Sequence, residues 1–192
     1  LGFGAMTTNT TGENNTASGR NSLYFNTTGS ENVAVGQQAL LNNTTADNNT
    51  AVGYQAAYAN TTGTQISAFG YLALNEATTP NNNAAFGTQA MRRLTTGSEN
   101  TAIGTEALRQ STTGSNNTAV GSASLILNTT GSNNTAFGFS TLLANTTGSS
   151  NTAIGKCSLV TNVSGGANIA IGLNALRLNT ASNNLAIGHC AM

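Results

Sequence analysis

The side chains that could carry covalent or acid–base chemistry are few in this chain. One histidine, His189, stands beside Cys190, and the second cysteine is Cys157. A thiol beside an imidazole is the pair that nucleophilic enzymes use when a third group orients the base. Adjacent residues of a strand point to opposite faces, however, and no carboxylate holds a recognisable orienting position. The sequence therefore predicts no catalytic residue and no enzymatic activity.

Charged residues are sparse as well, at 6% of the chain with no net charge. The acidic residues are Glu13, Glu31, Asp47, Glu76, Glu99 and Glu106. They form no calcium-binding repeat, and no helix follows the glycines to make a phosphate loop. The basic residues are scattered as Arg20, Arg92, Arg93, Arg109, Lys156 and Arg177. Nucleic acid would need a clustered basic surface, so we expect no metal, no cofactor and no nucleic-acid partner.

Asparagine offers one further kind of chemistry, because Asn-x-Thr/Ser is the acceptor sequence for N-glycosylation. Such sequons occur at Asn26, Asn60, Asn128, Asn145 and Asn162. If the source glycosylates them, these turns would be displayed outward and would carry sugar. A repeat rich in Asn and Thr also produces sequons by chance, so the sequence leaves this question open.

The elements that position all of these residues follow from a glycine that recurs every seventeen residues. The anchors are Gly19, Gly36, Gly53, Gly70, Gly87, Gly104, Gly121, Gly138, Gly155 and Gly172, with compressed copies at Gly4 and Gly188. A fixed short period is typical of one structural unit stacked on copies of itself. The chain is therefore predicted to be a rod.

Each repeat contains strand and turn signals. In the repeat around Gly104, residues 100–104 alternate like a short strand, and a second short strand is expected around Ala107 and Leu108. Residues 112–116, Thr-Thr-Gly-Ser-Asn, have the composition of a turn. Seventeen residues leave no room for a helix. The expected fold is an all-β parallel β-solenoid of about twelve coils.

The array is expected to occupy residues 1–192 as a single unit, a window of a longer chain. Large apolar residues hold fixed slots in every repeat, which argues against disorder. No apolar run approaches the roughly 18 residues of a membrane span, so no membrane insertion is expected within this segment. Cys157 and Cys190 are predicted to lie two coils apart, nearly 10 Å, which is too far for a disulfide.

Three columns of the repeat determine which face is inside. Alanine stands two residues before most anchors, and a large apolar residue stands one before. Four residues before the anchor come Asn15, Asn32, Asn49, Asn83, Asn100, Asn117, Asn134, Asn151, Asn168 and Asn184, broken only by Ile66. Identical Asn side chains at the strand spacing can form an amide ladder and satisfy the backbone at a bend.

Two packings are compatible with these columns. Either Ala and Asn point into a thin coil and the large Ile, Val and Phe residues point outward, or the large residues fill the coil. We favour the first, because an Asn ladder belongs in the interior. It leaves a continuous outward stripe of about eleven large apolar residues, an aggregation hazard unless other chains cover it. A homotrimer around a central axis is expected, and a dimer remains open.

The segments 100–104 (NTAIG), 117–121 (NTAVG) and 151–155 (NTAIG) resemble the head repeats of trimeric autotransporter adhesins. The longer unit, with its Thr-Thr-Gly-Ser-Asn turn, also resembles repeat arrays of phage tail fibres. The likeness spans all the coils, although the period is longer and no stalk or anchor lies in this window. The resemblance implies a left-handed, trimeric β-roll and a role in attachment, and it transfers no ligand.

These observations leave three functions open. The first is an extracellular fibre segment, a tail-fibre or surface-adhesin shaft or head that contributes to binding a glycan or protein receptor. The second is a self-assembling extracellular filament, and the third is ice recognition by an imperfect Thr lattice. Individual ligand contacts are not predicted. Positions that break the repeat and could touch a ligand are Tyr54, Tyr58, Tyr71, Arg92, Arg93 and Phe139.

Overall fold

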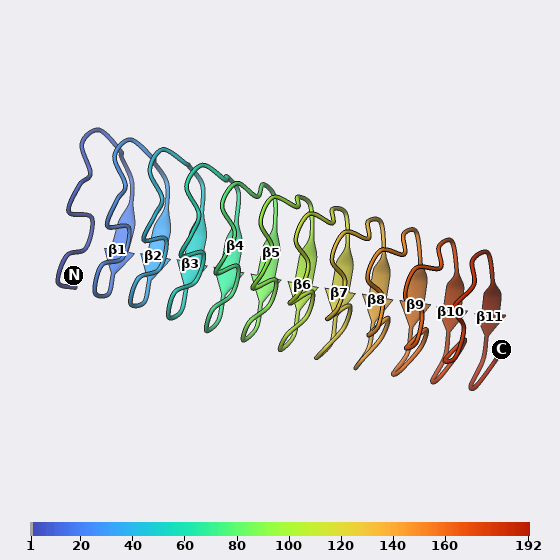
Figure 1. The fold of residues 1–192 in the computed structure, drawn as a ribbon. Coiled ribbons are helices and arrows are strands. Elements are labelled where there is room, and N and C mark those ends of the chain that lie inside the picture. Colours follow the sequence, from blue (N-terminus) through green and yellow to red (C-terminus); the bar gives the residue numbers. More distant parts are fainter. Residues whose placement is uncertain (1) are drawn as a thin grey trace.

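The chain coils into a parallel β-solenoid in the computed structural model, which describes residues 2–192 (Figure 1). Successive coils each contribute one three-residue strand to a single eleven-stranded sheet, in sequence order. The strands are β1 (Thr16–Ser18), β2 (Val33–Val35), β3 (Thr50–Val52), β4 (Ser67–Phe69), β5 (Ala84–Phe86), β6 (Thr101–Ile103), β7 (Thr118–Val120), β8 (Thr135–Phe137), β9 (Thr152–Ile154), β10 (Ile169–Ile171) and β11 (Leu185–Ile187). Residues 2–192 contain no helix. The predicted all-β solenoid is confirmed, although residues 2–15 contain no strand.

Residues that pair between neighbouring strands are one repeat apart in the sequence. Thr101 pairs with Thr118, Ala102 with Ala119 and Ile103 with Val120, and the same offset recurs between the neighbouring strands. Each position of the repeat therefore forms a column that runs along the solenoid axis, with neighbours separated by about 4.8 Å. An interaction that a side chain makes with the equivalent side chain of the next coil is therefore repeated along the solenoid.

The interior is filled from both sides of each coil. Ala102 of β6 is fully buried, and so are Ala107 and Leu108 on the segment that returns after the glycine corner. The alanine column is inside, as predicted. The expectation of a purely alanine-filled coil is wrong in one respect, because the leucine four residues after the anchor also fills the interior, as at Leu40, Leu125 and Leu142.

The second strand expected around Ala107 and Leu108 is absent. Glu106 and Leu108 have positive φ angles of 59° and 52°, so the returning segment zigzags through left-handed residues instead of extending. This backbone turns two consecutive side chains, Ala107 and Leu108, into the same interior. An extended strand would have sent one of them to each face.

The predicted asparagine ladder is present and buried. Asn117 donates from its backbone N–H to Asn100 Oδ1 at 3.0 Å, and its Nδ2 donates to the same oxygen at 3.1 Å and to the Gly131 carbonyl at 2.9 Å. Its own Oδ1 accepts the same pair of bonds from Asn134. Ile66 interrupts the ladder: its N–H still donates to Asn49 Oδ1, but it has no amide to offer Asn83.

A second asparagine ladder lies seven residues after the anchor. Asn43 donates to Asn26 Oδ1 at 2.8 Å, and Asn145 donates to Asn128 Oδ1 at 2.9 Å. Each amide also donates to the carbonyl three residues on, as Asn145 does to Gly148. Three consecutive coils break this ladder with Ala77, Leu94 and Ser111, all buried. Asparagine therefore forms two structural columns, of which only the column before the anchor was predicted.

The anchor glycine is required by the corner after the strand. Gly104 has a φ angle of +132°, which residues with a side chain rarely adopt. A Cβ built there would lie 2.7 Å from the carbonyl carbon and oxygen of Gly121 in the next coil. The seventeen-residue glycine period is thus the period at which the corners stack.

Replacing one ladder asparagine should destabilise the array. Asn117→Ala removes the bonds given above and leaves buried partners on Asn134 and Gly131, which costs roughly 2–4 kcal/mol. We expect chemical denaturation, at one fixed protein concentration, to show a free energy of unfolding lower by that amount. Thr113→Ala is the control, because Thr113 is exposed on a turn; an equal loss in both variants would contradict the ladder's role.

Candidate functional site

An apolar stripe covers the outer face of the sheet. It consists of the large residues one position before each anchor, which are Val35, Val52, Phe69, Phe86, Ile103, Val120, Phe137, Ile154, Ile171 and Ile187. Ile103 is 44% exposed and Phe137 54% exposed, whereas Ala102 and Ala136 of the same strands are fully buried. The predicted outward direction of these residues is confirmed. Ser18 replaces the apolar residue on β1.

Aromatic rings widen the stripe over β3, β4 and β5. Phe69 and Phe86 stack with their ring centroids 4.8 Å apart and their planes 7° apart. In the next column, just after the glycine, Tyr54 and Tyr71 stack at 5.5 Å and 15°. Tyr71 is half exposed. The rings face one another along the axis and present their edges outward, where a neighbouring molecule could interdigitate with them.

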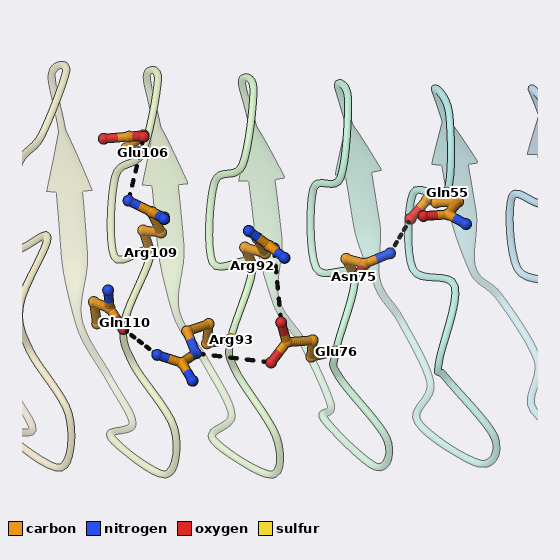
Figure 2. A network of polar contacts seen from close by, with 8 residues as sticks. All are labelled: Gln55, Asn75, Glu76, Arg92, Arg93, Glu106, Arg109 and Gln110. Atoms are coloured by element: carbon orange, nitrogen blue, oxygen red, sulfur yellow. Dashed lines mark hydrogen bonds and ion pairs between the residues drawn. The ribbon is translucent and has the colours of Figure 1, made fainter.

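The other outward surface is formed by the returning segments, and charge gathers there. Figure 2 shows Glu76, Arg93 and Gln110 in one row across three coils and Asn75, Arg92 and Arg109 in the adjacent row. Both carboxylate oxygens of Glu76 pair with guanidinium Nε atoms, at 3.6 Å with Arg92 and 3.8 Å with Arg93.

Figure 2 also shows two further contacts of this polar cluster. Arg93 Nη1 donates to Gln110 Oε1 at 2.8 Å, and Arg109 Nη1 lies 3.4 Å from Glu106 Oε1. The expectation that basic residues are merely scattered is therefore wrong for three of them. The signal was in the spacing, because Glu76, Arg93 and Gln110 are each one repeat apart, as are Arg92 and Arg109.

The cluster is not fully satisfied by its own contacts. Among the described residues, the Nε atoms of Arg92 and Arg109 and the Oε1 of Gln89 are buried without a hydrogen-bond partner. The ion pairs are long, and the side chain of Arg93 is 55% exposed. Of these groups, the Arg93 side chain is thus the one most open to solvent.

The other repeat-breaking positions lie at the surface without forming a site. Tyr58 is half-buried on a returning segment. Phe139 is exposed beside the stripe, and the Lys156 ammonium lies 5.8 Å above its ring centroid. Such an exposed cation–π contact contributes about 0.5–1 kcal/mol and needs no ligand to explain it.

His189 and Cys190 do not point to opposite faces, contrary to the sequence expectation. Nε2 of His189 lies 3.4 Å from Sγ of Cys190, because Cys190 has a φ angle of 54° and follows the strand rather than continuing it. Both side chains are exposed. Over residues 2–192, no group of three or more His, Cys, Asp or Glu side chains could hold a metal. Cys157 and Cys190 are both free thiols in this structure.

The sequon asparagines lie inside the solenoid. Asn26, Asn60, Asn128, Asn145 and Asn162 are all fully buried members of the second ladder. Glycosylation would require these side chains to be displayed outward, but the turn exposes the third residue of each sequon instead, as at Thr147 and Ser164. An N-linked sugar on any of these side chains is incompatible with the folded coil.

Comparisons with protein-family models, with curated proteins and with solved structures give no match for this chain. No helix long and apolar enough to cross a membrane occurs among residues 2–192. The two candidate surfaces are therefore judged on their geometry: the apolar stripe on the sheet, and the polar cluster on the returning segments.

Because the sequon asparagines are buried, we expect an oligosaccharyltransferase to leave them unmodified in the folded protein. Offered the enzyme and its lipid-linked sugar after folding, the chain should gain no glycan at Asn145 or Asn162. The same chain offered unfolded should be modified there. Peptide mapping by mass spectrometry distinguishes the two, and equal occupancy in both states would contradict the buried ladder.

Proposed function

We propose that this chain is a structural segment of an extracellular attachment fibre, a tail-fibre or adhesin shaft or head, whose copies bury the apolar stripe against one another. The observation that carries the proposal is the stripe itself, which continues without a polar interruption from β2 to β11. Ten neighbouring strands at about 4.8 Å make it roughly 45 Å long. Contiguous apolar surface of this extent marks an interaction site.

The energetics favour association through this face. A large apolar side chain gains about 1.5–3 kcal/mol when it goes from full exposure to full burial. Since the stripe residues are already about half covered, each would add on the order of 1 kcal/mol, or about 10 kcal/mol for the stripe. Association itself costs about 4–15 kcal/mol. Burial of the stacked aromatic rings beside the stripe would add the further free energy that makes association favourable.

A homotrimer is the arrangement that we propose, with the stripes against a central axis. A closed symmetric assembly covers the apolar face of every copy without leaving one open. The likeness of the NTAIG segments to trimeric adhesin heads supports this choice and the extracellular, cell-surface or virion location. A stiff rod of this kind would hold a receptor-binding region away from the surface that carries it.

The molar mass in solution tests the proposal. Light scattering should give roughly three times the 19.3 kDa of one chain, independent of concentration. A stable monomer would contradict burial of the stripe, and a mass that grows without limit would favour the filament alternative. A mass of two chains would retain the buried stripe and reject the trimer.

A substitution on the stripe should weaken this assembly. Phe137→Glu places a carboxylate where another copy would cover it, and burying an unpaired charge is strongly unfavourable. We expect the association constant to fall at least about tenfold per interface and the chain to run as a monomer at micromolar concentration. Thr113→Glu, on an exposed turn, is the matched control and should keep the wild-type mass.

A further inference from the structure

One column of the solenoid changes its chemistry in every coil. Six residues after the anchors from Gly19 to Gly104 stand Phe25, Asn42, Ala59, Glu76, Arg93 and Gln110. The interior columns hold alanine, leucine or asparagine in coil after coil because packing requires them. None of these six is buried, so the fold does not dictate their identity. Recognition of a ligand is a reason for such a column to differ from its neighbours.

The first half of this column lines a groove. Phe25, Asn42 and Ala59, with Thr27, Thr44 and Thr61 alongside, line a shallow, open groove of about 550 Å³ that extends across three coils. Phe25 is 45% exposed and forms a wall, and the small Ala59 leaves room beyond it. The groove is mainly apolar with a few placed polar groups, which is typical of ligand sites.

The polar groups of the groove suit hydroxyl-rich ligands. Thr27 and Thr44 donate their hydroxyls to carbonyls of the next coil, at 3.0 and 3.2 Å, which leaves lone pairs free to accept. The Asn42 backbone N–H donates to the Tyr58 carbonyl, and its half-buried side-chain amide can both donate and accept. Sugar hydroxyls need both kinds of partner, and a pyranose ring packs its C–H face on an aromatic ring such as Phe25.

The second half of the column is the polar cluster. Glu76, Arg93 and Gln110 occupy the position of Ala59 in the next three coils, so the row of Figure 2 begins one coil beyond the groove. Three arginines face two glutamates in the cluster, which leaves one positive charge. Arg93 is the most exposed of the three arginines. Its planar fork matches a carboxylate better than a point charge would.

We infer that the column from Phe25 to Gln110 binds a linear acidic polysaccharide, with a sugar chain along the groove and a carboxylate at Arg93. Five intervals of about 4.8 Å give a site roughly 24 Å long, which suits an extended polymer. The site lies on the returning segments, away from the apolar stripe, so it stays open when copies cover the stripe. This inference rests on the proposed attachment function and names its ligand class.

Binding to galacturonate oligosaccharides, measured by calorimetry on the assembled protein, tests the inference. Arg93→Gln should weaken binding roughly tenfold, since a charge-assisted hydrogen bond is lost. Phe25→Ala should weaken it by a similar factor. Arg177→Gln is the matched control, because it removes an exposed arginine from a returning segment outside the groove, and it should bind as the wild type does. Added salt should weaken binding of the wild type more than that of Arg93→Gln.

Several outcomes would overturn the inference. One is equal binding of the same oligosaccharides after their carboxyl groups are reduced to alcohols. Others are unchanged affinity in both Arg93→Gln and Phe25→Ala, preference for a sulfated over a carboxylated polymer, and no binding to any uronate polymer at millimolar concentration. The molar mass and circular dichroism of each variant are recorded in parallel, so that a failure of assembly is distinguished from a failure of the glycan site.

Discussion

The whole structure depends on the stacking of each coil on the next in a register equal to the repeat. Backbone hydrogen bonds between coils fix that register, as when the Thr101 N–H donates to the Asn117 carbonyl at 2.8 Å. Once the register is fixed, each side chain lies next to the side chain at the same repeat position in the adjacent coil. Polar residues inside must then satisfy one another along the column, and asparagine does so because its amide both donates and accepts. The two asparagine ladders are the consequence, and they allow a coil of seventeen residues to bury polar groups.

The same stacking separates two kinds of column. Interior columns are constrained by packing and hydrogen bonding, so Ala102, Leu108 and Asn117 have equivalents in most coils. Outward columns are free to vary, and two of them have features that packing does not require: the apolar stripe over the sheet and the changing column on the returning segments. Since these surfaces face opposite ways, one can serve assembly while the other remains exposed. A rod built in this way can combine rigidity with a recognition surface along its length.

Much of this fold could be predicted from the sequence, because the glycine period sets the coil and strand alternation decides that Ala102 points in and Ile103 out. The returning segment could not, because its left-handed residues are ordinary ones such as Glu106 and Leu108, with no glycine to mark them. The second ladder was hidden by Ala77, Leu94 and Ser111, and its members were interpreted as sequons. The polar cluster could have been found by applying the period to Glu76, Arg93 and Gln110. The outward direction of the stripe could be predicted. The molecule that covers the stripe could not, because its identity is not encoded in the pattern of this one sequence.

The central claim is that the stripe of one copy lies against the stripes of others. The most direct test measures the distance between spin labels at position 103 in different copies. Cys157 and Cys190 are first replaced by serine, and the label is attached through Ile103→Cys. Pulsed electron resonance then gives the distance. The account predicts a short, narrow distance distribution for labels at Ile103 and a much longer one for labels at Thr113. A short distance at Thr113 with none at Ile103 would show that copies meet through the turns, and a lack of any coupling at either position would show that the stripe stays uncovered.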